Sequence, residues 1–149
     1  MLNKTELKDI EEIAAKYYMN PVLVELNRLI ATKGAKEALS YLHPTILGVK
    51  DKVLAIIKKR KTAGKINDVA QASKTAVGSI FSNSIIYLFL KAKEKGLVKE
   101  NIFITSKPKR FKELIAINVD GETQKPDLDL VVYSNDDKAN LANLMIISL

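Results

Sequence analysis

The longest helical pattern in the chain covers residues 66–96, which read INDVAQASKTAVGSIFSNSIIYLFLKAKEKG. Asn67 or Asp68 can cap its start, and Gly96 follows its end, as glycine often does after a helix. Residues 85–90 are apolar on more than one side of the pattern, which is typical of a helix buried all round. We therefore expect this stretch, as one long helix or two shorter ones, to be the central buried helix.

The residues before this stretch also read as helices. Apolar side chains recur at helical spacing, and Pro21 and Gly34 stand where one helix should begin and end. The proline after His43 should stop the short helix that precedes it. The expected helices are TELKDIEEIAAKYY (5–18), NPVLVELNRLIATKG (20–34), AKEALSYL (35–42) and TILGVKDKVLAIIKKRK (45–61).

Length and composition indicate an ordinary globular chain. It has 149 residues, of which 47% are hydrophobic and 28% are charged. The absence of cysteine excludes disulfides and thiolate metal sites and suits a cytoplasmic protein. No uninterrupted apolar run approaches the roughly 18 residues of a membrane span, and the first ten residues lack a signal-peptide centre. We expect no membrane association.

The charge is strongly basic and unevenly distributed. Lysine and arginine number 24 against 17 acidic residues, which gives a net charge of +7. Such a chain can neutralise phosphates, although a generally lysine-rich composition explains the charge equally well. Charge alone does not separate DNA from RNA or from an acidic protein. The candidate DNA-binding residues are Lys58, Lys59, Arg60 and Lys61 in one cluster, and Lys107, Lys109 and Arg110 in another.

The pattern changes from helical to strand-like after Gly96. Residues 111–120 (FKELIAINVD) are consistent with a strand, and the following Asp-Gly pair marks a turn. Residues 128–133 (LDLVVY) and 144–149 (LMIISL) predict two more strands. The expected fold class is therefore α+β, with an N-terminal helical region followed by three consecutive strands.

Asp127 and Asp129 alternate at the start of the second expected strand and so share one face of it. Two carboxylates there can simply be solvated at a strand end. They can also be ligands of a hard cation such as Mg²⁺, which prefers carboxylate and carbonyl oxygens beside a substrate phosphate. Spacing alone leaves both interpretations open.

The segment KPDLDLVVYS…MIISL resembles the first part of the PD-(D/E)xK nuclease motif of type II restriction endonucleases. The resemblance implies a core in which a helix precedes a three-stranded antiparallel meander. It divides the chain into a helical region, 1–61, and the incomplete first half of a nuclease core, 62–149. Ser148 stands where most members have an acidic residue, as in the CCGG-recognising group, which carries Ser-x-Lys there. A helical N-terminal region also resembles the BsaWI-like members.

The resemblance assigns roles to individual residues. Asp127 would be catalytic and a Mg²⁺ ligand, and the backbone carbonyl of Leu149 would be a further ligand. Asp129 would support the metal from outside its ligand set. Many members add an upstream acidic residue, for which Glu113, Asp68 and Glu94 are candidates, and nothing in the sequence chooses between them.

The implied function is that of a type II site-specific deoxyribonuclease in a restriction-modification system. Such an enzyme cleaves double-stranded DNA with Mg²⁺ and acts as a homodimer on two-fold symmetric sites. The motif lysine would come directly after the last residue here, so we expect this chain to be an inactive N-terminal part of the enzyme. The DNA sequence that it recognises is not derivable.

Two alternatives are non-enzymatic. One alternative is a DNA-binding helix-turn-helix, because the spacing of four residues roughly resembles that motif in repressors: Ser73, Thr75, Val77 and Asn83. In such a motif, Lys74 and Thr75 would contact DNA. The glycine-containing turn of that motif is missing, which favours a core helix instead. The other alternative is a helical interaction module with a partial sheet.

Overall fold

The structure is a computed structural model of the chain, and it describes residues 2–105, 117–119, 122–124, 130–134 and 145–147. It divides into two compact units, Met1–Val98 and Lys99–Leu149. The first unit is helical, and the described residues of the second form strands from Ile102 onward. The division at residue 61, which was drawn from the resemblance to a nuclease core, stays a prediction.

The helices of the first unit follow one another with short connections. Two of them are very short: one lies between Gly34 and a 3-10 turn, and the other between that turn and Val49. In chain order the elements are α1 (Lys4–Ala15), α2 (Asn20–Lys33), α3 (Ala35–Ala38), the 3-10 turn η1 (Leu39–Tyr41), α4 (Leu42–Gly48), α5 (Lys50–Thr62) and α6 (Val69–Glu94).

Side chains and glycines define the helix ends. At the start of α1, Asn3 Oδ1 accepts a hydrogen bond from the Glu6 amide at 2.8 Å, and Glu6 Oε1 accepts one from the Asn3 amide at 3.0 Å. This reciprocal cap satisfies two amides that have no partner within the helix. Asp68 Oδ1 caps α6 by accepting from the Gln71 amide at 3.2 Å. Gly34 ends α2 with a φ of 87°, which glycine adopts without strain.

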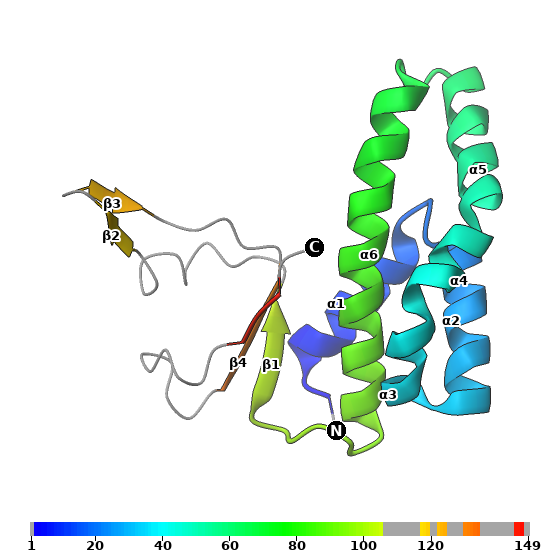
Figure 1. Cartoon of the computed structure of the whole chain (residues 1–149). Coiled ribbons are helices and arrows are strands. Elements are labelled where there is room, and N and C mark those ends of the chain that lie inside the picture. Colours follow the sequence, from blue (N-terminus) through cyan, green and yellow to red (C-terminus); the bar gives the residue numbers. More distant parts are fainter. Residues whose placement is uncertain (1, 106–116, 120–121, 125–129, 135–144, 148–149) are drawn as a thin grey trace. The chain divides into compact units, whose positions relative to one another are not determined.

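Helix α6 is the central element of the first unit (Figure 1), as the sequence predicts. It is one continuous helix of 26 residues that packs against α1, α2, α3, α4 and α5. Because neighbours surround it, apolar side chains on several of its sides are removed from water. Its buried apolar residues are Ala76, Ile80, Ile86, Tyr87, Leu88, Leu90 and Ala92.

A buried ion pair joins the two ends of this unit's sequence. Lys93 Nζ of α6 donates a hydrogen bond to Glu6 Oε2 of α1 at 2.7 Å, and the two side chains are only 1% and 7% exposed. The other carboxylate oxygen of Glu6 belongs to the cap of α1. Removing Lys93 leaves the Glu6 carboxylate buried without its charge partner, which costs far more than losing a surface pair.

Two tyrosines make polar contacts between α6 and the helices before it. The Tyr18 hydroxyl is hydrogen-bonded to Ser79 Oγ, and the Tyr87 hydroxyl donates to Asn27 Oδ1 at 2.5 Å. Burial raises the pKa of Tyr87 above 10.0, the negative charge of Glu94 acts in the same direction, and the bond with Asn27 partly opposes them. These contacts fix how α6 is rotated against α2 and the connection before it.

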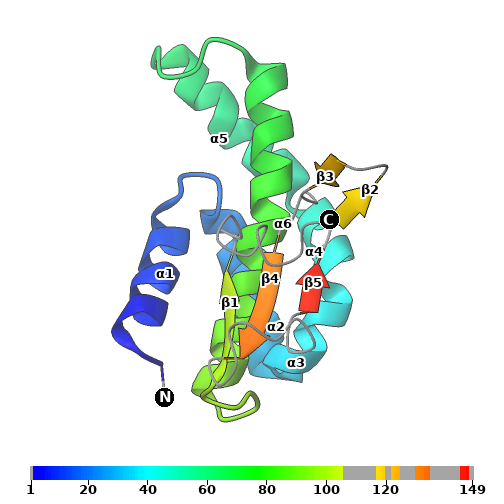
Figure 2. The same ribbon diagram turned by 90° about the vertical axis from the view of Figure 1, so that its left-hand side faces the viewer.

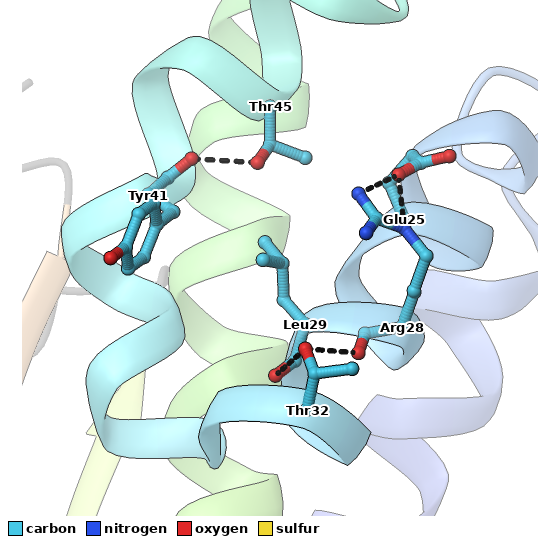
Figure 3. Close-up of polar contacts among 6 residues, drawn as sticks. All are labelled: Glu25, Arg28, Leu29, Thr32, Tyr41 and Thr45. Atoms are coloured by element: carbon cyan, nitrogen blue, oxygen red, sulfur yellow. Dashed lines mark hydrogen bonds and ion pairs between the residues drawn. The ribbon is translucent and has the colours of Figure 1, made fainter.

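The polar contacts on the outside of α2 and α4 are of a different kind (Figure 3). Arg28 donates two hydrogen bonds to Glu25 Oε2, at 2.7 and 2.9 Å, but its side chain is 64% exposed. Thr32 and Thr45 donate to the carbonyls of Arg28 and Tyr41, four residues earlier, at 2.9 and 2.7 Å. Exposed pairs of this type contribute about 0–1 kcal/mol, so the buried pair of Glu6 and Lys93 is the stronger constraint.

The second unit contains two antiparallel sheets in its described residues. Strands β1 (Ile102–Thr105), β4 (Leu130–Ser134) and β5 (Met145–Ile147) lie side by side in the order β1-β4-β5 (Figure 2). Phe103 is paired with Tyr133, and their rings stack at 5.6 Å. Leu130 of the central strand is fully buried and is paired with Ile147. Strands β2 (Ile117–Val119) and β3 (Glu122–Gln124) form a separate two-stranded sheet.

The predicted fold class, an α+β restriction-endonuclease-like core, is wrong. The described residues are mainly helical, and the three expected strands do not form one meander. Within 111–120, the described strand Ile117–Val119 pairs with Glu122–Gln124 and not with β4. The reason is local: only Asp120 and Gly121 separate β2 from β3, and such a two-residue link favours pairing of its own flanks. The place beside β4 is taken by β1, which the sequence did not indicate.

The buried ion pair leads to a stability prediction. We expect Lys93→Met to lower the free energy of unfolding by about 3–5 kcal/mol, because it leaves the Glu6 carboxylate buried without its charge partner. Glu6→Gln should also destabilise the chain, although glutamine preserves the cap of α1. The double variant should lose less than the sum of the single losses, as measured by urea denaturation followed by far-UV circular dichroism. Strict additivity of the two losses would contradict the coupling.

Tyr87 leads to a prediction with a pH dependence. Tyr87→Phe removes the bond to the exposed Asn27 and should cost about 1 kcal/mol at neutral pH. The pKa of Tyr87 is higher in the folded chain than in the unfolded one, so its contribution is complete below about pH 10 and is lost as pH rises further. The stability deficit of the variant relative to the native chain should therefore shrink above about pH 10. A deficit that is constant or grows with pH would contradict this assignment.

Candidate nucleic-acid interface

The connection between α5 and α6 carries the first basic cluster of the sequence. Helix α5 and the N-terminal half of α6 extend beyond the other helices of this unit (Figures 1 and 2). Lys59 and Lys61 lie in the last turn of α5, Lys58 directly precedes that turn, and Lys65 follows in the connection. All four side chains are exposed. We call these four lysines the basic tip.

The basic tip is part of a wider concentration of charge. Residues 50–65 hold seven basic side chains and one acidic side chain, so this segment carries +6 of the chain's net +7. Helix α1 carries a net negative charge instead, because it holds four acidic and two basic side chains. A cluster of exposed lysines attracts polyanions and neutralises phosphates without requiring a particular base sequence.

Arg60 has a different role from the lysines beside it. Its guanidinium carbon lies 4.0 Å from the centre of the Tyr17 ring, and the side chain is only half exposed. Its Nε atom is buried and has no hydrogen-bond partner among the described residues. Stacking of arginine on an aromatic ring stabilises the fold, so Arg60 fastens α5 to the connection between α1 and α2. Of the four predicted DNA-binding residues in this cluster, Arg60 is the one whose charged group stacks on an aromatic ring of the protein.

The other predicted site residues fall outside the described part of the chain. These are the metal-site residues Asp127, Asp129, Glu113, Ser148 and Leu149, and the basic residues Lys107, Lys109 and Arg110. The strands next to the metal-site residues are described. Leu130 is paired with Ile147, and in the sequence these two residues are the neighbours of Asp129 and Ser148.

The upstream acidic candidates Asp68 and Glu94 are described and lie far apart. Asp68 precedes the first residue of α6 and caps it, whereas Glu94 is the last residue and lies 4.0 Å from Lys91. A helix of this length separates its ends by roughly 39 Å. They were predicted as alternatives, and at this separation at most one of them can complete a given metal site. Within the described residues, no three histidine, aspartate or glutamate side chains gather closely enough to hold a metal ion.

The helix-turn-helix alternative requires a turn that the structure replaces with helix. Residues Val69–Glu94 form one uninterrupted α-helix through Ser73, Thr75 and Asn83. Lys74 and Thr75 are exposed, but Asn83 is buried and donates to Ser79 Oγ at 3.0 Å. The stretch is a core helix with a polar start, as its pattern favours.

The sequence did not reveal an apolar groove between α4, α5 and α6. Its lining includes Leu47 and Val77, which are 56% and 44% exposed. Both residues follow the helical spacing of their neighbours, so a periodicity argument assigns them to a helix face without showing whether that face is covered. Solvent exposure of large apolar side chains is visible only once the helices are assembled.

Helix α6 is also long and apolar enough to span a membrane by length and composition, and half of its most apolar window is buried within the protein. The core helix of a soluble protein meets the same criterion, and α6 carries the buried Lys93, whose partner Glu6 lies on α1. The arrangement of the described residues is compatible with a soluble protein.

Comparison with protein-family models, with curated proteins and with solved structures found no match to this chain.

Proposed function

We propose that this protein acts on double-stranded DNA as part of a type II, site-specific deoxyribonuclease that uses Mg²⁺. The observation that carries the proposal is the pairing of Leu130 with Ile147. The sequence neighbours of this pair are Asp129 and Ser148, which belong to the two halves of the nuclease-like motif. Antiparallel pairing brings the start of one strand next to the end of the other, as the two halves of one metal site require.

The proposed metal ligands are the Asp127 carboxylate and the Leu149 carbonyl, with Asp129 in support and Glu113 as a further acidic candidate. Oxygen ligands of this kind suit Mg²⁺, which completes its coordination with water and substrate phosphate. Bound Mg²⁺ would supply charge stabilisation for phosphodiester hydrolysis. A metal site needs only that its ligands converge, so the proposal does not depend on the meander that the structure contradicts.

The basic tip is the proposed grip on DNA. Its four exposed lysines lie on a helical hairpin whose position is held by the stacking of Arg60 on Tyr17. Lysine binds phosphate as a point charge and gives affinity without base specificity. Base reading must therefore come from elsewhere in the protein. We further propose a homodimer in the cytoplasm, because two-fold symmetric DNA sites are read by two-fold symmetric proteins.

A second candidate function is DNA binding without catalysis. It is favoured by the basic tip, whose four exposed lysines need no metal ion to bind phosphate. Both candidates predict DNA binding by the tip. They differ in whether Asp127 makes that binding respond to Mg²⁺.

The proposed grip is tested by replacing three lysines of the tip. Lys58→Gln, Lys59→Gln and Lys61→Gln together should weaken binding of a labelled DNA duplex by at least about tenfold at roughly 0.1 M salt. The slope of log affinity against log salt should also fall by about 2–3, close to 0.9 per lost phosphate contact. Fluorescence anisotropy measures both. The matched control is Lys4→Gln, Lys8→Gln and Lys16→Gln, which removes the same charge from exposed residues of α1 and its end. If both variants lost DNA affinity equally, the loss would reflect the net charge of the protein and not a binding site at the basic tip.

The proposed metal site is tested by calorimetry on the protein–DNA complex, because Mg²⁺ usually shares its ligands with phosphate. Mg²⁺ should bind the complex of the native chain, and Asp127→Asn should weaken that binding by at least about tenfold, while DNA affinity without the metal is unchanged. Asp51→Asn is the matched control on the exposed surface of α5. Identical Mg²⁺ binding by all three proteins would remove the metal site and leave the non-catalytic candidate.

A further inference from the structure

The groove between α4, α5 and the N-terminal half of α6 is a feature that the proposed function does not use. It has a volume of about 270 Å³ and is lined mainly by apolar side chains. Leu47 comes from α4, Leu54 and Ile57 from α5, and Val77 and Phe81 from α6. Leu47 and Val77 are more than 40% exposed, so part of this apolar lining faces water. Such a surface gains free energy when a partner covers it.

One polar group in the lining has no partner in the described part of the chain. Ser73 Oγ is buried and makes no hydrogen bond there, although Ser73 itself is only half buried. At the far end of the lining, the His43 ring stacks on Phe81 at 5.9 Å. The groove thus has a polar group towards the tip of the hairpin and an aromatic wall at its other end.

The charges around the groove are positive. Lys50 is part of the lining, and no acidic side chain is. Lys61 lies one helical turn beyond Ile57 on the same face of α5, and Lys74 follows Ser73 on α6; both lysines are exposed. A second copy of this chain would bring an equally basic rim against this one, which opposes self-association. An acidic partner is attracted instead.

The length of the groove matches two turns of an α-helix. Its lining on α5 runs from Lys50 to Ile57, and the seven helical steps between these residues span about 10.5 Å. An amphipathic helix presents apolar side chains at positions i, i+4 and i+7 over the same distance. Apolar lining, basic rim and length together define one type of occupant.

We propose that this groove binds an amphipathic helix of a partner protein, with a leucine-type apolar stripe flanked by glutamate or aspartate. The apolar stripe covers Leu47, Val77 and the residues between them. The acidic flanks pair with Lys50, Lys61 and Lys74. The proposal concerns residues of α4, α5 and α6 alone and does not rest on the proposed nuclease function.

The test uses a fluorescent, acetylated and amidated peptide of about 14 residues, or four helical turns, with leucine at i, i+4 and i+7 and glutamate on both flanks. Anisotropy should show saturable binding with a Kd on the order of 10 μM. The same peptide with its glutamates replaced by lysine, and a scrambled peptide, should each bind at least about tenfold more weakly. Equal binding of the lysine or scrambled peptide, or no saturable binding, would overturn the proposal.

Variants of the protein locate the binding surface. Leu47→Asn with Val77→Asn should weaken peptide binding by at least about tenfold. The matched control is Leu39→Asn with Val24→Asn, two apolar residues that are 51% and 62% exposed and lie outside the groove. Both double variants should keep the far-UV circular dichroism spectrum of the native chain.

Two results with these variants would reject the assignment. Equal loss of peptide binding in both double variants would mean that the peptide does not occupy the groove. Sedimentation analysis that finds a dimer dissociated by the groove variant alone would assign the groove to a second copy, against the charge argument.

Discussion

The helical unit depends on a buried ion pair between Glu6 of α1 and Lys93 of α6. Both charges are almost completely buried, and such a pair is tolerated only when each partner is in place. The second oxygen of Glu6 also closes the cap of α1. One carboxylate therefore sets where α1 begins and which face of the last turns of α6 points inward. The two residues are 87 positions apart in the sequence, so this contact links the first helix of the unit to its last.

The central position of α6 determines how the other helices of the unit and the α5–α6 hairpin are arranged. Its apolar side chains are covered by five other helices, and its N-terminal half continues with α5 into a hairpin beyond them. Arg60, in the last turn of α5, stacks on Tyr17 and so attaches this hairpin to the connection between α1 and α2. A charge cluster on a fixed support presents its lysines in a constant arrangement and so concentrates the positive potential of the protein in one region. The same hairpin forms two walls of the apolar groove.

The functional proposals rest on surfaces with different chemistry. The tip is highly charged and exposed and suits phosphates, which require no shape complementarity. The groove is apolar with a basic rim and suits a structured amphipathic partner. The pairing of β4 with β5 concerns the remaining proposal, a metal site whose ligands flank these strands in the sequence. DNA binding is common to both candidate functions, and metal dependence separates them.

The sequence by itself determined much of the helical unit, because helix ends and helical periodicity depend only on neighbouring residues. Asp68 and Gly96 mark the ends of α6, and the apolar residues between them predict its central position. The clustering of lysines in residues 58–65 is likewise evident in the sequence.

Only the tertiary structure decided features that depend on distant partners. His43-Pro44, expected to stop a helix, lies in the first turn of α4, where the missing amide of proline has no cost. The strand Ile102–Thr105 is too short to be recognised alone and is defined by its pairing with β4. Arg60 and its lysine neighbours look alike in sequence, and Tyr17, 43 positions away, separates their roles. Strand pairing and side-chain packing are non-local, so no local pattern encodes them.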